Sequence, residues 1–171
     1  MKYRLFIASF LPEETACKIR DLQLKALNSC VNLISIENFH ITYSFLGDTD
    51  ENEIPKLKVL VSDFNRELSG IQCHYEDIIA FEQHGKSPIA VRLSFSKNIS
   101  VAVEALQQKS SGDVKKFIPH ITIGKARNVF VSDVLESYRE TFSDNGISFP
   151  LAPALLAKSE ISQHGSRYFI L

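Results

Sequence analysis

The sequence predicts an α+β fold built from two similar halves. Apolar and β-branched segments typical of strands are interspersed with amphipathic segments typical of helices, in an order that suits antiparallel pairing. The succession of strand, helix, strand and helix occurs twice, and two copies favour two similar lobes rather than a solenoid. The 171 residues, 44% hydrophobic and 23% charged, are enough for a substantial core.

The first half of the chain contains two main strands and two helices. Residues 3–10 form an apolar strand, and Pro12 suits the first turn of a helix after it. A short segment at 31–36 leads to a second strand at 39–46. The next helix is the clearest element, because its buried stripe keeps a spacing of three and four residues: Ile54, Leu57, Val61, Phe64 and Leu68.

The second half repeats this order and adds three strands. Each copy begins with an Arg-Leu pair, at Arg4-Leu5 and at Arg92-Leu93, which we take as a sign that the copies correspond. The elements are a strand at 71–82, a loop at 84–88, a strand at 89–95, a helix carrying Ile99, Val103 and Leu106, a strand at 117–124, a helix at 132–142, and strands at 147–161 and 167–171 that meet in a turn at 164–166.

The tripeptide His-Ile-Thr occurs once in each half, within a predicted strand. Because alternate residues of a strand face the same side, His40 projects beside Thr42, and His120 beside Thr122. A single copy is best explained as a buried histidine in a strand, but two copies in matching contexts favour a functional role. Facing each other across a groove, they would offer two imidazoles and two hydroxyls, a minimal set for cleaving a phosphate ester without a metal.

Charge and cysteine content exclude several classes of function. A net charge of −1 argues against a protein that grips long nucleic acids electrostatically, although a ligand with a few phosphates still fits. Cys17, Cys30 and Cys73 are odd in number and irregularly spaced, which argues against a disulfide framework or a zinc site. No segment has the pattern of a secretory signal or of a membrane span. We therefore expect a cytoplasmic monomer with no membrane partner and no bound metal.

The segments around both motifs resemble those of the two-histidine (2H) phosphoesterase superfamily. The closest likeness is to the RNA 2′,3′-cyclic phosphodiesterases, also called the 2′-5′ RNA ligase family. It rests on FHITYSFLG, FIPHITIG, the N-terminal RLFIASFLPEE and the C-terminal SEISQHGSRYFIL, and so spans residues 4–171. The resemblance implies a single 2H phosphoesterase domain over residues 1–171, with two lobes of antiparallel sheet flanked by helices and the active cleft between them.

The resemblance also implies an activity: hydrolysis of RNA-type 2′,3′-cyclic phosphates to 2′-phosphates, without metal or cofactor. The substrates would be RNA ends or small nucleotides that carry the cyclic phosphate. His40 and His120 match the catalytic histidines, and Thr42 and Thr122 the phosphate-binding threonines. Family analogy makes His40 the general acid and His120 the general base, an assignment that the sequence itself leaves open.

Two cations follow the second motif. The family's motif usually continues to an arginine where this chain has Lys125, which keeps the charge but loses the bidentate fork. Arg127, two residues further on, suits the same phosphate-binding role, although a solvated surface pair explains both cations equally well. Phe10 and Phe45 suit base stacking, but we expect both in the core, together with Tyr43.

Three other functions stay open at this point. They are 2′-5′ RNA end joining, hydrolysis of a different cyclic phosphodiester, and non-catalytic binding of phosphorylated ligands. The presence of both histidines and both threonines argues against the last of these, because a binding protein would not need two proton-transfer groups.

Overall fold

The computed structural model describes the chain except for residues 27–29, 82–86, 128–130, 144 and 163–164. The predicted loop at 84–88 and turn at 164–166 therefore lie partly outside the described residues. The elements are β1 (Lys2–Phe10), α1 (Glu13–Lys25), β2 (Val31–Leu33), the short 3₁₀ helix η1 (Ile36–Asn38), β3 (His40–Asp50), the 3₁₀ helix η2 (Glu51–Glu53), α2 (Ile54–Leu68), β4 (Gln72–Ala80), β5 (Ser87–Phe95), α3 (Ser100–Lys109), β6 (His120–Ala126), α4 (Val131–Ser143), β7 (Ser148–Pro150), β8 (Leu155–Ser162) and β9 (Gly165–Ile170).

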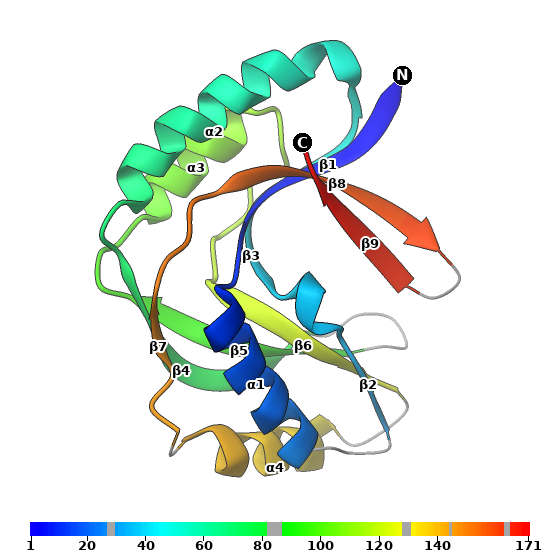
Figure 1. Ribbon diagram of the computed structural model, residues 1–171, viewed down its shortest axis with the longest axis vertical. Helices are drawn as coiled ribbons and strands as arrows, with labels where there is room; N and C mark the ends of the chain where they lie inside the picture. The colour runs from blue at the N-terminus through cyan, green and yellow to red at the C-terminus, as the bar shows by residue number, and fades with distance from the viewer. Residues whose placement is uncertain (27–29, 82–86, 128–130, 144, 163–164) are drawn as a thin grey trace.

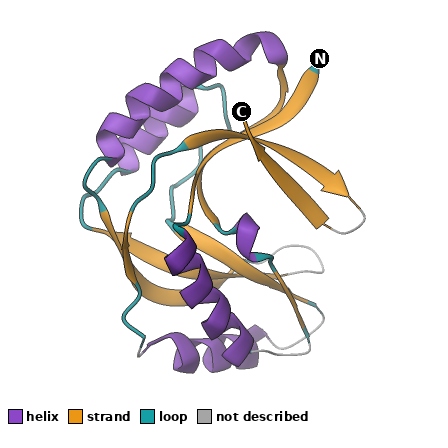
Figure 2. Cartoon of the chain, in the orientation of Figure 1, coloured by secondary structure: helices purple, strands orange, loops and turns teal. Residues whose placement is uncertain are grey.

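The described strands form two antiparallel sheets. Sheet A has the strand order β3-β1-β8-β9, and sheet B has the order β2-β6-β5-β4-β7. Helices α2 and α3 lie together against sheet A, whereas α1 and α4 lie together at the other end of the molecule (Figure 1). Figure 2 shows α2 and α3 at the upper left of the molecule and α4 at the bottom, below sheet B. The predicted bilobal α+β fold is confirmed.

The two halves of the chain exchange elements between the sheets. β2 belongs to the first half but joins sheet B beside β6, and the C-terminal hairpin of β8 and β9 joins sheet A beside β1. Helix α3 belongs to the second half but packs on β3 of sheet A. Each sheet therefore depends on both halves of the chain.

The strand register corrects the alignment of the two copies. Phe10 of β1 lies opposite His40, and Arg92 of β5 lies opposite His120. Phe10, not Arg4, is therefore the counterpart of Arg92, and the two Arg-Leu pairs are not equivalent. A polar residue followed by an apolar one recurs in any half-buried strand, so the dipeptide carries no information about register.

The predicted single strand at 147–161 is wrong, because that segment is divided between the two sheets. β7 pairs with β4 in sheet B, and β8 pairs with β1 in sheet A. Pro150 is the last residue of β7, and Pro153 lies in the segment that crosses to β8. Proline has no N–H to donate to a ladder, so it ends one strand and delays the next.

One continuous core of buried side chains lies between the helices and the sheets. It includes the predicted stripe of α2, with Leu57, Val61, Phe64 and Leu68 buried. Tyr43 is also buried, as expected, but Phe45 is 59% exposed, so the prediction that Phe45 packs in the core is wrong. Among the described residues, no helix is long and apolar enough to cross a membrane.

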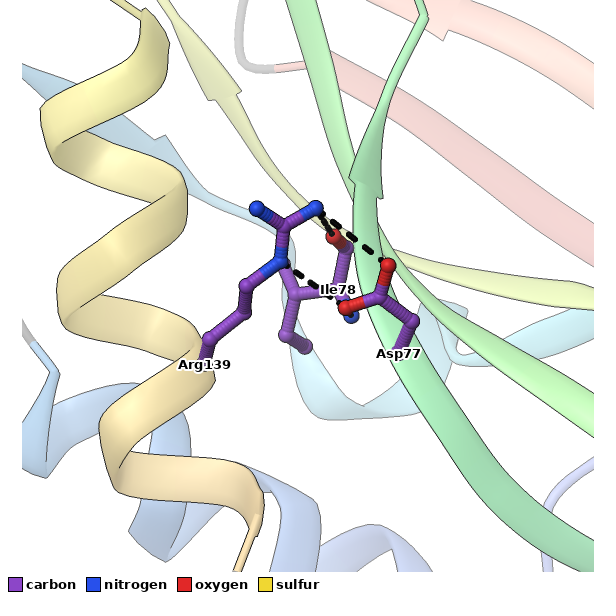
Figure 3. Close-up of polar contacts among 3 residues, drawn as sticks. All are labelled: Asp77, Ile78 and Arg139. Atoms are coloured by element: carbon purple, nitrogen blue, oxygen red, sulfur yellow. Dashed lines mark hydrogen bonds and ion pairs between the residues drawn. The ribbon is translucent and has the colours of Figure 1, made fainter.

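Helix α4 is oriented on sheet B by Arg139. Its Nε donates to Oδ1 of Asp77 at 2.8 Å, and its Nη2 donates to Oδ2 of Asp77 at 3.2 Å and to the carbonyl oxygen of Ile78 at 3.0 Å (Figure 3). Both charged side chains are more than a third exposed, so the ion pair adds at most about 1 kcal/mol. Its main effect is to set the position of α4 along β4.

A β-bulge follows each His-Ile-Thr segment. In β3, Thr42 and Ser44 pair with consecutive residues of β1, which leaves Tyr43 without a partner. In β6, Thr122 and Gly124 pair with consecutive residues of β5, which leaves Ile123 without one. A bulge shifts the alternation of side chains by one residue, so the residues after it reach the face that carries the histidine.

The carbonyl of each bulged residue accepts a hydrogen bond from a buried glutamine of the other half of the chain. Gln107 of α3 donates its Nε2 to the carbonyl oxygen of Tyr43 at 2.8 Å, and its Oε1 accepts from the backbone N–H of Lys115 at 3.0 Å. Gln23 of α1 likewise donates to the carbonyl oxygen of Ile123. Gln23 is 0% exposed and Gln107 is 4% exposed, so these bonds are sheltered from water.

Replacing Gln107 by leucine should destabilise the protein by about 1–3 kcal/mol, because the buried carbonyl of Tyr43 and the partly buried N–H of Lys115 lose their partner. Urea denaturation measures the change in the free energy of unfolding. Gln108→Leu is the matched control: Gln108 is exposed and makes a single side-chain bond, to Glu104 at 3.3 Å. Equal stability of the two variants would contradict the role given to Gln107.

Candidate active site

Both His-Thr pairs face away from the core. In β3, His40 and Thr42 are half-buried while Ile41 and Tyr43 are buried. The same alternation occurs in β6, where Ile121 and Ile123 form part of the core. The predicted side-by-side projection of each histidine with its threonine is therefore what these strands produce.

The two imidazoles are held in the same way. Nδ1 of His40 lies 2.6 Å from the carbonyl oxygen of Asn38, and Nδ1 of His120 lies 2.7 Å from the carbonyl oxygen of Ile118, in each case two residues earlier in the chain. A carbonyl oxygen only accepts, so Nδ1 carries the hydrogen in both rings. Nε2 is then the nitrogen that can take up or release a proton at a substrate.

Aromatic side chains enclose His40. Its ring centre lies 5.4 Å from that of Phe6, 5.6 Å from that of Phe10 and 5.1 Å from that of Tyr168. Burial lowers the pKa of His40 below its ordinary value of 6.5, the hydrogen bond to Asn38 opposes that shift, and the charge of His120 lowers the pKa further. Strands β3 and β6 contact each other, so the two histidines lie on neighbouring strands.

His120 has a simpler environment. Its ring packs on Phe81, with ring centres 4.7 Å apart. Burial lowers its pKa, and the hydrogen bond to the carbonyl of Ile118 opposes the shift. Both rings are therefore neutral more often near pH 7 than free imidazole would be.

A cleft of about 430 Å³ opens beside His40, on the face of sheet A that carries the aromatic cluster. Its walls come from β1, β3, β8 and β9 and from the segment before β6. His120 and the two threonines do not line it, so the cleft extends from His40 away from the second motif. The lining residues are Arg4, Leu5, Phe6, His40, Phe45, Leu46, Gly47, Ser111, Asp113, Lys115, Ser159, Ser166 and Tyr168.

The far wall of the cleft is tied to the first motif. Nδ2 of Asn38 donates to the carbonyl oxygen of Ser166 at 3.0 Å, which links η1 to β9. Burial raises the pKa of Tyr168, and both a hydrogen bond with the Ser166 side chain and the charge of Arg4 oppose the shift. Arg4 therefore lies close enough to act on the same wall.

The two cations after the second motif differ in their contacts. Because of the bulge at Ile123, Lys125 and Arg127 are exposed, while Ala126 between them is buried. The guanidinium of Arg127 donates through Nη2 and Nε to the amide oxygen of Asn32, at 2.9 and 3.0 Å, in the amide orientation that satisfies both side chains. Lys125 makes no ion pair with the acids that the structure describes.

Sequence reasoning missed several residues of the site. Phe6, Arg4 and Lys115 meet His40 only through the fold, and no local pattern singles them out. Tyr168 and Ser159 belong to the C-terminal segment that resembles the family, which was the available signal, and both line the cleft. Within the described parts of the chain, no group of three or more His, Cys, Asp or Glu side chains could hold a metal ion.

The sequence has relatives of known activity. It is 24% identical over 173 residues to the RNA 2′,3′-cyclic phosphodiesterase of Methanocaldococcus jannaschii, covering 98% of each chain. It is 27% identical over 152 residues to the RNA 2′,3′-cyclic phosphodiesterase of Archaeoglobus fulgidus, covering 82% of this chain and 84% of that one. No family model matches the chain.

Solved structures share the fold. E. coli LigT complexed with 3′-AMP has a TM-score of 0.72 at 18% identity, covering 100% of this chain and 96% of that one. TT0787 of Thermus thermophilus has a TM-score of 0.68 at 22% identity, covering 98% and 94%. The relatives and the fold together confirm the resemblance found in the sequence: over nearly its whole length the chain is similar to the RNA 2′,3′-cyclic phosphodiesterases.

Proposed function

We propose that this protein hydrolyses RNA-type 2′,3′-cyclic phosphates to 2′-phosphates without a metal, with His40 and His120 as its proton-transfer groups. One observation carries the proposal: two imidazoles with the same Nδ1–carbonyl bond, each leaving Nε2 for a substrate, stand at the start of two strands that contact each other. The activity for which the two sequence relatives are named supports the reaction class. The LigT complex with 3′-AMP supports a nucleotide as ligand.

In the proposed reaction, water attacks the phosphorus in line with the departing 3′ oxygen of the ribose. One imidazole takes a proton from the water, and the other gives a proton to the 3′ oxygen as the P–O bond breaks. Each proton transfer contributes about 10²–10⁴ to the rate. Imidazole suits both roles because its two protonation states are both accessible near neutrality.

The position of the cleft supports His40 as the acid and His120 as the base. In-line displacement puts the attacking water and the leaving oxygen on opposite sides of the phosphorus. The leaving oxygen belongs to the nucleoside, so the acid lies on the side where the nucleoside is bound. The cleft of about 430 Å³, a volume that suits a nucleotide, is lined by His40, and His120 is not among its described lining residues.

The neighbouring polar residues would stabilise the charge that builds on phosphorus. Thr42 and Thr122 project beside the two histidines and can donate their hydroxyls to the non-bridging oxygens. Lys125 is exposed on the same face of β6 and adds a positive charge. Arg127 is held by Asn32, which orients the guanidinium while leaving its other N–H groups for a phosphate.

His40→Ala and His120→Ala should each lower kcat for adenosine 2′,3′-cyclic phosphate by about 10²–10⁴, because each removes one proton transfer. Chromatography of the product measures turnover and identifies the 2′-phosphate. His74→Ala serves as the control, since His74 lies on β4 and, within the described part of the chain, its side chain bonds to Ser148.

Adding a chelator to the wild-type reaction should leave its rate unchanged. Loss of activity with chelator, a 3′-phosphate product, or full activity in either alanine variant would refute the mechanism.

The two imidazoles should titrate as a coupled pair. His120→Gln removes a nearby positive charge, so the pKa of His40 should rise in that variant. Ring-proton chemical shifts followed by NMR against pH measure the pKa directly. A pKa of His40 that does not move would show that the rings lie too far apart to act on one phosphorus atom.

The pH profile of kcat/KM should be a bell whose maximum lies below pH 6.5. One imidazole must be neutral and the other protonated, and burial lowers both pKa values below 6.5 in the free enzyme. Activity should therefore fall on the alkaline side as the acid loses its proton, and on the acid side as the base gains one. A maximum above pH 7 would contradict the assignment.

A further inference from the structure

The cleft beside His40 extends further than the cyclic phosphate requires. His40 stands at one end, opposite Phe10, and Arg4 stands at the other end, six residues earlier in β1. Ala8 pairs with Thr42, and Arg4 lies four residues before Ala8, which is roughly 13 Å along the strand. The long side chain of Arg4 can cover much of that distance. The cleft therefore has room for the nucleoside that carries the reacting phosphate.

The face of sheet A in this cleft is aromatic. Phe45 is 59% exposed, and its ring centre lies 6.5 Å from that of Phe6 at an angle of 31° between the planes. The bulge at Tyr43 brings Phe45 to this face, where it lines the cleft. An exposed aromatic ring on a strand beside a phosphate site is the usual platform for a nucleobase.

The far end of the cleft is positively charged. Arg4 is exposed and makes no ion pair with the acids that the structure describes. Lys115 also lines the cleft and pairs with Asp113 at 3.1 Å, with both side chains 69% exposed. The charges of Arg4, Lys115 and Asp113 sum to +1. An unpaired arginine in a cleft, beyond an aromatic platform, suits a second phosphate.

We infer that the cleft binds a nucleotide with its base on Phe45 and its 5′-phosphate on Arg4. The inference rests on the proposed function and adds a subsite for the 5′-phosphate to it. A nucleoside 2′,3′-cyclic phosphate with a 5′-hydroxyl fills only part of the cleft, whereas one with a 5′-phosphate also engages Arg4.

The test compares two substrates that differ in one group: adenosine 2′,3′-cyclic phosphate with a 5′-hydroxyl, and the same nucleotide with a 5′-phosphate. The wild type should have a roughly tenfold lower KM for the second, because a hydrogen-bonded charge pair is worth that much. Arg4→Gln should remove most of this advantage, and Arg4→Lys should restore part of it. Phe45→Ala should raise KM for both substrates by about tenfold, since both carry the base.

Arg66→Gln is the matched control. Arg66 lies on α2, its side chain is 82% exposed, and it pairs with Asp63 at 3.6 Å outside the cleft. The ratio of the two KM values should be the same in this variant as in the wild type. Circular dichroism establishes that each variant is folded.

The outcomes separate this inference from the proposed function. If the wild type cleaves both substrates with equal KM, or if Arg4→Gln affects both equally, the inference is wrong while the proposed function stands. If the wild type cleaves neither, the proposed function fails. Calorimetric titration with 5′-AMP then tests whether Arg4 binds the 5′-phosphate. Binding that weakens in Arg4→Gln but not in Arg66→Gln would support it, and binding that does not depend on Arg4 would overturn it.

Discussion

The β-bulge after each His-Ile-Thr segment is the constraint on which the site depends. Without it, strict alternation would turn Phe45 and Lys125 to the core side of their strands. The bulges at Tyr43 and Ile123 turn both residues to the face that carries the histidines. The carbonyl of each bulged residue accepts a hydrogen bond from a buried glutamine of the opposite half of the chain, and the carbonyl of Ile123 also accepts one from the backbone N–H of Ile34.

The same scaffold is used differently in the two lobes. Phe10 and Arg92 occupy equivalent positions opposite the two histidines, and Phe45 and Lys125 are equivalent after the two bulges. In both comparisons the first lobe presents an aromatic ring and the second presents a cation. A cyclic nucleotide has the same asymmetry, with a flat base on one side of its phosphate and solvent on the other. The repeat therefore places the two imidazoles in the same way, whereas their different neighbours favour one orientation of a bound nucleotide.

Parts of this protein could be predicted from local patterns, and the errors have definite physical causes. The stripe of α2 and the outward projection of each His-Thr pair follow from helix and strand periodicity alone. Phe45 was misplaced because periodicity assumes an unbroken strand, and the bulge is set by contacts with β1 and α3. The two Arg-Leu pairs were misaligned because register belongs to pairs of strands and not to one of them.

Local spacings in the sequence predict the α+β class, the helical core stripes and the residue types of the proposed phosphate-cleaving site. These depend on spacings of a few residues, over which the geometry of helices and strands is nearly constant. The packing of α3 on the sheet of the first half depends on the whole fold, and so does the cleft that Arg4, Lys115 and Tyr168 share with His40. The fold also brings β3 and β6, whose first residues are the two histidines, into contact. Contacts over such separations arise from the burial of whole faces, and no short segment of the chain encodes them.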